Sequence, residues 1–96
     1  MAGKRILIVE DEFIIAANLR QVLVDLGYDV IGHAFDAQEA LDLLRQNVAD
    51  LVLIDIRLGS GMDGIELAAL IRAESAVPFV FLTSHGDSNT VSRAIQ

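Results

Sequence analysis

The stretch Ile6-Leu7-Ile8-Val9-Glu10-Asp11-Glu12, written ILIVEDE, decides the fold expected of this chain. Its apolar half predicts a strand over 4–9 that is buried on both faces, as in a parallel sheet covered by helices. The three acids follow where that strand would leave the sheet at its carboxyl end. Ligands of open α/β sheets bind at this end, so the acids are candidates for capping a helix or for holding a cation.

The same pattern of a buried strand ended by an acid recurs at Leu51-Val52-Leu53-Ile54-Asp55. Spacing and capping signals predict the remaining elements. The first half of the chain is expected to form a helix over 12–26 stopped by Gly27, a strand over 29–34, and a helix that Asp36 opens with Glu39 and that carries Val48. After Asp55 we expect a glycine-containing loop, a helix from 65, a strand over 79–82 and a short helix over 88–96. Strands and helices alternate throughout. This order predicts an α/β fold with a doubly wound parallel sheet and helices on both faces.

Composition restricts the partners of the chain. Its 96 residues form one domain, over residues 1–96, with 53% hydrophobic residues and a net charge of -7. The negative charge argues against direct contact with nucleic acid or an anionic membrane, because phosphates would repel it. There is no cysteine, and no apolar run reaches the roughly 18 residues of a membrane span. We therefore expect a cytoplasmic protein.

The C-terminal part of the pattern is incomplete. The last helical stretch has no stop signal, and Phe79-Val80-Phe81-Leu82 is an apolar strand of a kind that proteins usually cover. We expect a domain truncated at its C-terminus, in which a homodimer or a swapped dimer is one way to cover the fourth strand.

Acids from two different strands are expected to meet. If the first and third strands are neighbours, Glu10, Asp11 and Asp55 lie together at the carboxyl edge of the sheet. Crowded carboxylates stay ionised only beside a cation, and hard oxygen ligands favour Mg²⁺. For Glu12 the favoured interpretation is a charge at the first turn of the following helix.

Asp55 is the candidate nucleophile, because a carboxylate beside Mg²⁺ can attack a phosphoryl group and form an acyl phosphate. Thr83 ends the fourth strand, where its hydroxyl can hydrogen-bond a phosphoryl oxygen. Taken alone, this residue is better interpreted as an ordinary strand-end or helix-entry hydroxyl. His33 and His85 are interpreted as solvated histidines rather than as ligands.

Four short motifs carry a family resemblance: VEDE (Val9–Glu12), LVLID (Leu51–Asp55), MDG (Met62–Gly64) and FLTS (Phe81–Ser84). With them the sequence resembles the receiver domain of two-component response regulators over its whole length. The resemblance implies a flavodoxin-like sheet of strand order 2-1-3-4, with a fifth strand and helix that would follow Gln96.

The resemblance also implies a function. Asp55 would be the phosphoacceptor and Thr83 the switch residue, and Asp11, Asp55 and the main-chain carbonyl of Arg57 would bind Mg²⁺ with Glu10 beside them. The donor would be a sensor histidine kinase or a phosphotransfer protein, and the domain would not be an enzyme in the usual sense. The family's lysine on the fifth strand would lie beyond Gln96.

Two other functions are open at this point. One is a Mg²⁺-dependent phosphohydrolase with an aspartyl-phosphate intermediate, although enzymes of the haloacid dehalogenase type carry a second acid where this chain has Arg57. The other is a degenerate receiver that acts only as an interaction module.

Overall fold

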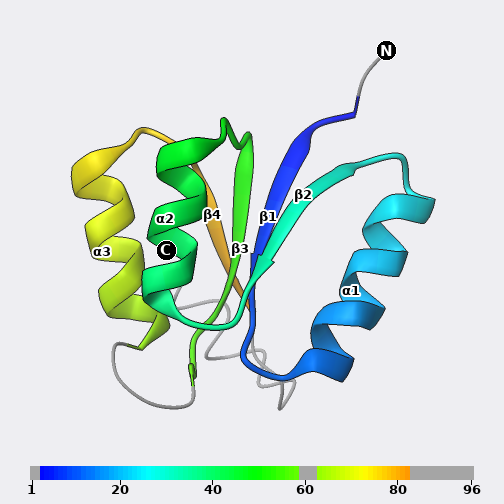
Figure 1. The fold of residues 1–96 in the computed structure, drawn as a ribbon, viewed down its shortest axis with the longest axis horizontal. Coiled ribbons are helices and arrows are strands. Elements are labelled where there is room, and N and C mark those ends of the chain that lie inside the picture. The colour runs from blue at the N-terminus through cyan, green and yellow to red at the C-terminus, as the bar shows by residue number, and fades with distance from the viewer. Residues whose placement is uncertain (1–2, 59–62, 83–96) are drawn as a thin grey trace.

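A computed structural model describes residues 3–58 and 63–82 of the chain, in which strands and helices alternate (Figure 1). The elements are β1 (Arg5–Val9), α1 (Phe13–Asp25), β2 (Asp29–Ala34), α2 (Ala37–Gln46), β3 (Leu51–Asp55), α3 (Gly64–Glu74) and β4 (Phe79–Leu82). All pairings are parallel and the sheet order is β2-β1-β3-β4, which confirms the predicted fold and strand order. The helix predicted over 88–96 lies outside the described residues.

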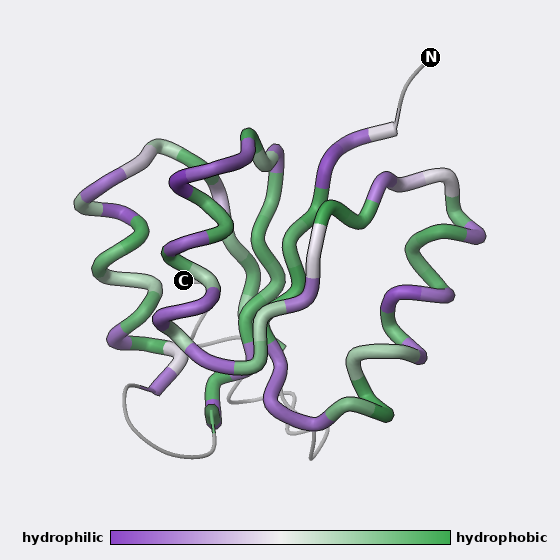
Figure 2. The backbone as a smooth tube through the Cα atoms, in the orientation of Figure 1, coloured by the Kyte–Doolittle hydropathy of each residue, from purple (hydrophilic) through white to green (hydrophobic). Residues whose placement is uncertain are grey.

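The sheet is covered on both faces. Helix α1 lies on one face, and α2 and α3 lie on the other (Figure 1). Alternation along β1 sends Ile6 and Ile8 toward α1, and Leu7 and Val9 toward α2 and α3. None of these four side chains is more than 1% exposed, and the apolar colour follows the central strands in Figure 2. This double burial is the reason why the strand reads as a continuous apolar run.

Strand β2 contains a bulge that decides which way its last residues point. Its pairing with β1 slips by one position, so that Ile31 is an extra residue. Ile31 packs on the α2 side, and a Cβ placed on the next residue, Gly32, would also point toward α2, at Leu43. Two successive residues on one side reverse the alternation, so Ala34 enters the core beside α2 and His33 faces α1.

The helix ends follow the predicted signals at two places and depart from them at one. Gly27 has a φ of 95° and ends α1, as predicted. Asp36 accepts a hydrogen bond from the amide of Glu39 at 2.8 Å, which confirms the N-cap of α2. Helix α2 stops before Asn47, whose side chain donates to a carbonyl of the last turn, so Val48 lies outside the helix and is 71% exposed. The prediction that α2 carries Val48 was wrong.

No helix within the described parts of the chain is long and apolar enough to cross a bilayer.

Candidate metal site at the carboxyl end of the sheet

The acids predicted to meet are brought together by neighbouring strands. Strands β1 and β3 pair in parallel with Val9 opposite Ile54, so the residues that follow these two positions lie at one level of the sheet. Glu10, Asp11 and Asp55 each place a carboxylate oxygen within 4.8 Å of the others. The predicted cluster is therefore present in the structure.

Two of these acids are buried, and one of their oxygens lacks a partner. Glu10 is 2% exposed and Asp55 is 3% exposed. Oδ1 of Asp55 accepts a hydrogen bond from the amide of Arg57 at 3.0 Å, whereas Oε1 of Glu10 has no hydrogen-bond partner among the described residues. Buried polar atoms normally have a partner, so an orphaned carboxylate oxygen fits a place where a cation completes the contacts. A set of carboxylate oxygens suits a hard cation such as Mg²⁺.

The electrostatics of the cluster depend on pH. Burial, a hydrogen bond to Asp55 and the charges of Asp55 and Asp11 raise the pKa of Glu10 from 4.5 to about 8. Without a metal, Glu10 is therefore largely protonated at neutral pH. A divalent cation would compete with this proton, because metal ligands must be deprotonated.

The remaining predicted site residues have different outcomes. Glu12 occupies the N-cap position of α1, as expected, but its side chain makes no capping hydrogen bond. The main-chain amide of Arg57 donates a hydrogen bond to the Asp55 side chain. That the Arg57 carbonyl is a metal ligand stays a prediction. Strand β4 ends at Leu82, which pairs with Asp55. The proposed switch residue Thr83 lies outside the described residues.

His33 is a site neighbour that the sequence interpretation missed. Its Nε2 lies 2.8 Å from the carbonyl oxygen of Glu10, and this contact is partly buried. The interpretation of His33 as a solvated histidine was therefore wrong. The sequence signal that was available is Gly32, because an isolated glycine inside a strand suggests a bulge but does not require one.

Gly64 closes the loop after β3. Its amide donates to the carbonyl of Ile56 at 3.0 Å, and the amide of Ile56 donates to the carbonyl of Leu82 at 3.1 Å. Asp63 and Glu66 form a capping box at the same helix start. A Cβ on Gly64 would collide with the main-chain carbonyl of Asp55. Only glycine lets α3 begin this close to the acidic cluster.

We expect Gly64→Ala to destabilise the protein by about 1–3 kcal/mol, because its methyl group must displace the backbone of Asp55. A loss of stability would be informative, because helix propensity alone would make the protein with alanine at this position the more stable one. Urea denaturation followed by circular dichroism measures the change. Gly32→Ala is the matched control: its Cβ would meet the flexible side chain of Leu43 at 3.3 Å, so we expect a smaller loss. Equal stability of Gly64→Ala and wild type would contradict the close approach.

Comparison with known proteins places the chain among bacterial signalling domains. Residues 6–96 match the family model of the response regulator receiver domain. The transcriptional regulatory protein PdtaR of Mycobacterium tuberculosis is 37% identical over 91 residues, which are 95% of this chain and 44% of the relative. YvrH of Bacillus subtilis is 40% identical and is matched over 35% of its length. The chain thus spans less than half of these relatives.

Solved structures show the same fold. The N-terminal domain of a response regulator/sensory box/GGDEF protein from Carboxydothermus hydrogenoformans is 40% identical, with a TM-score of 0.81 over 88% of this chain and 67% of that chain. The signal receiver domain of a modulated diguanylate cyclase from Desulfovibrio desulfuricans is 41% identical, with a TM-score of 0.81 over 95% of this chain and 73% of that chain.

Proposed function

Because the chain belongs to the family of response regulator receiver domains, we propose that residues 1–96 form a receiver that takes a phosphoryl group onto Asp55 with the help of Mg²⁺. The observation that supports this role most directly is the buried, orphaned oxygen of Glu10 in a cluster where Glu10, Asp11 and Asp55 bring carboxylate oxygens within 4.8 Å of one another. In its fully ionised form, a cluster of this kind is unfavourable without a cation, and a bound cation would offset the repulsion.

The proposed reaction is a transfer between two side chains. An oxygen of Asp55 attacks the phosphorus of a phosphohistidine on a sensor kinase or a phosphotransfer protein. The new P–O bond makes an acyl phosphate, while the P–N bond breaks and its electron pair leaves with the imidazole. Asp11, Asp55 and the main-chain carbonyl of Arg57 would hold the cation, with Glu10 beside them. When bound, Mg²⁺ offsets the negative charge on the phosphoryl oxygens.

The output would be a change of surface rather than turnover of a substrate. Receiver domains are signalling modules and not classical enzymes. We propose that the Thr83 hydroxyl binds the phosphoryl group and that this contact shifts the domain between two conformations. A PhyR of Bartonella quintana, which is 32% identical to this chain, was solved in complex with the anti-sigma factor NepR, and we propose that the changed surface likewise binds a partner protein.

Direct binding of this domain to nucleic acid is not part of the proposal, because the chain carries a net charge of -7. Relatives such as the MtrA proteins are named DNA-binding response regulators, and this chain covers 36% of the MtrA of Mycobacterium tuberculosis.

Intact-mass spectrometry tests the proposal. The protein is incubated with a small phosphoryl donor, once with Mg²⁺ and once with a chelator. We expect an adduct of one phosphoryl group that forms only with Mg²⁺. Multiple turnover of a small phosphate ester would instead favour the phosphohydrolase. Absence of both the adduct and Mg²⁺ binding would favour a degenerate receiver.

A further inference from the structure

The end of β2 holds the backbone of the acidic segment from two sides. The amide of Glu10 donates to the carbonyl of Ala34 at 3.0 Å. On the other side of the same residue, the carbonyl oxygen of Glu10 lies 2.8 Å from Nε2 of His33. Because a carbonyl oxygen only accepts hydrogen bonds, Nε2 must carry the proton in this contact. Both the neutral Nε2–H tautomer and the imidazolium ion satisfy this condition.

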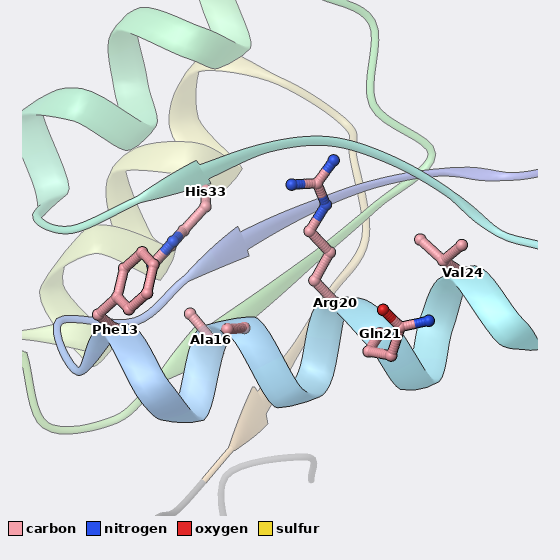
Figure 3. A pocket seen from close by; sticks show the side chains of 7 residues that line it. Phe13, Ala16, Arg20, Gln21, Val24 and His33 are labelled. Atoms are coloured by element: carbon pink, nitrogen blue, oxygen red, sulfur yellow. The ribbon is translucent and has the colours of Figure 1, made fainter.

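The ring of His33 is positioned by packing. Its centroid lies 4.1 Å from the ring of Phe35 and 6.5 Å from the ring of Phe13. Figure 3 shows the side chains of His33 and Phe13 directed toward one another, His33 from β2 and Phe13 from the start of α1. The two residues form one end of an open cavity of about 400 Å³ between α1 and β2. The bulge at Ile31 turns the imidazole to this side of the sheet.

The hydrogen bond to His33 acts on the acids through a rigid unit. The carbonyl of Glu10 and the amide of Asp11 belong to one planar peptide group, so a bond that fixes the carbonyl also fixes the direction in which Asp11 leaves the strand. The carboxylates of Glu10, Asp11 and Asp55 repel one another when ionised. A backbone held at one point resists the separation that this repulsion favours.

On the basis of the proposed function, we propose that His33 is a positioning residue for the cation site, which holds the Glu10–Asp11 peptide so that the carboxylates converge. It does not itself contact the cation. Outer-shell hydrogen bonds to metal-ligating side chains typically contribute about 10- to 100-fold to metal affinity. Since the contact here is to the backbone rather than to a ligand atom, we expect the low end of that range.

Two substitutions separate the hydrogen bond from the packing of the ring. His33→Phe keeps an aromatic ring beside Phe13 and Phe35 but removes the N–H donor. His33→Gln removes the ring but keeps an N–H donor the same number of bonds from Cα. Gln21→Ala is the control, because Gln21 lines the same cavity and hydrogen-bonds to Asp25, away from the acids.

The measurement is the Mg²⁺ dissociation constant by isothermal titration calorimetry, together with the urea denaturation midpoint in a chelator. We expect His33→Phe to raise the dissociation constant about tenfold, His33→Gln to restore most of the affinity, and Gln21→Ala to leave it unchanged. If His33 had only a structural role, His33→Phe would lower the urea denaturation midpoint without changing the Mg²⁺ dissociation constant of the folded protein.

Two results would overturn the inference while leaving the proposed function intact: wild-type affinity in His33→Phe, or equal losses in His33→Phe and His33→Gln with both variants folded. Failure of the wild-type protein to bind Mg²⁺ would be a different result, because it would overturn the proposed function and the inference together.

Discussion

We expect Asp55→Asn to abolish the phosphoryl adduct that the wild-type protein forms with a small donor and Mg²⁺. An amide oxygen does not act as the nucleophile that a carboxylate provides, so the acyl phosphate cannot form. The shape of the side chain is conserved, and its oxygen can still accept the hydrogen bond from the amide of Arg57. The loss should therefore be chemical rather than structural. Intact-mass spectrometry measures the adduct directly.

Asp42→Asn provides the matched control for this experiment. It makes the same change of side chain on the exposed outer surface of α2, where Asp42 accepts a hydrogen bond from the side chain of Gln38 at 3.1 Å and pairs with the exposed Arg45 at 3.7 Å. Such a pair contributes little to stability, and we expect a normal adduct. A persistent adduct in Asp55→Asn would place the acceptor elsewhere, and peptide mapping would test whether Asp11 takes its place.

The second large effect is on stability as a function of pH. In the metal-free protein, the pKa of Glu10 is raised from 4.5 to about 8. The folded state therefore holds a proton that the unfolded state has released across this interval, and stability must fall as the pH rises through it. Below about 4.5 both states are protonated and the contribution of Glu10 is fully present. Between pH 4.5 and about pH 8, the free energy of unfolding should fall by on the order of a few kcal/mol.

Urea denaturation in a chelator at a series of pH values measures this loss. We expect the free energy of unfolding to decline between pH 5 and pH 8, and Mg²⁺ to restore it most strongly at the upper end, where the ligands are ionised. Glu10→Gln removes the titrating group, so its profile should be flatter over the same range. A wild-type profile that rises between pH 5 and pH 8 would show that Glu10 is not desolvated as the structure indicates.

Much of the site could be predicted because the information is local. Apolar runs ended by acids at Val9-Glu10 and Ile54-Asp55 indicate strands that leave a covered sheet at the same edge. A parallel arrangement then brings the acids to one level, and the structure confirms this for Glu10, Asp11 and Asp55. The stop at Gly27 was also predicted correctly from local sequence, whereas the correct strand order came from the family resemblance.

Other features depend on contacts between distant segments. Leu58 follows β3 in what reads as a loop, yet it is 6% exposed and belongs to the core beside α2 and α3. The collision that makes Gly64 necessary involves the carbonyl of Asp55. Neither property follows from the residues on either side, because each is created by the partner that packs against it.

By itself, the sequence determined an α/β sheet whose first and third strands end in acids. Continuous apolar runs indicate buried strands, and the acids directly after these runs mark the carboxyl ends of the strands. Only the tertiary structure decided how deeply Glu10 is buried, and therefore that its pKa lies near 8. It also decided that a bulge at Ile31 turns His33 toward the acidic segment. The physical reason is the same in both cases. Burial and strand register are set by the neighbouring elements, so they cannot be inferred from the residues next to Glu10 or His33 in the sequence.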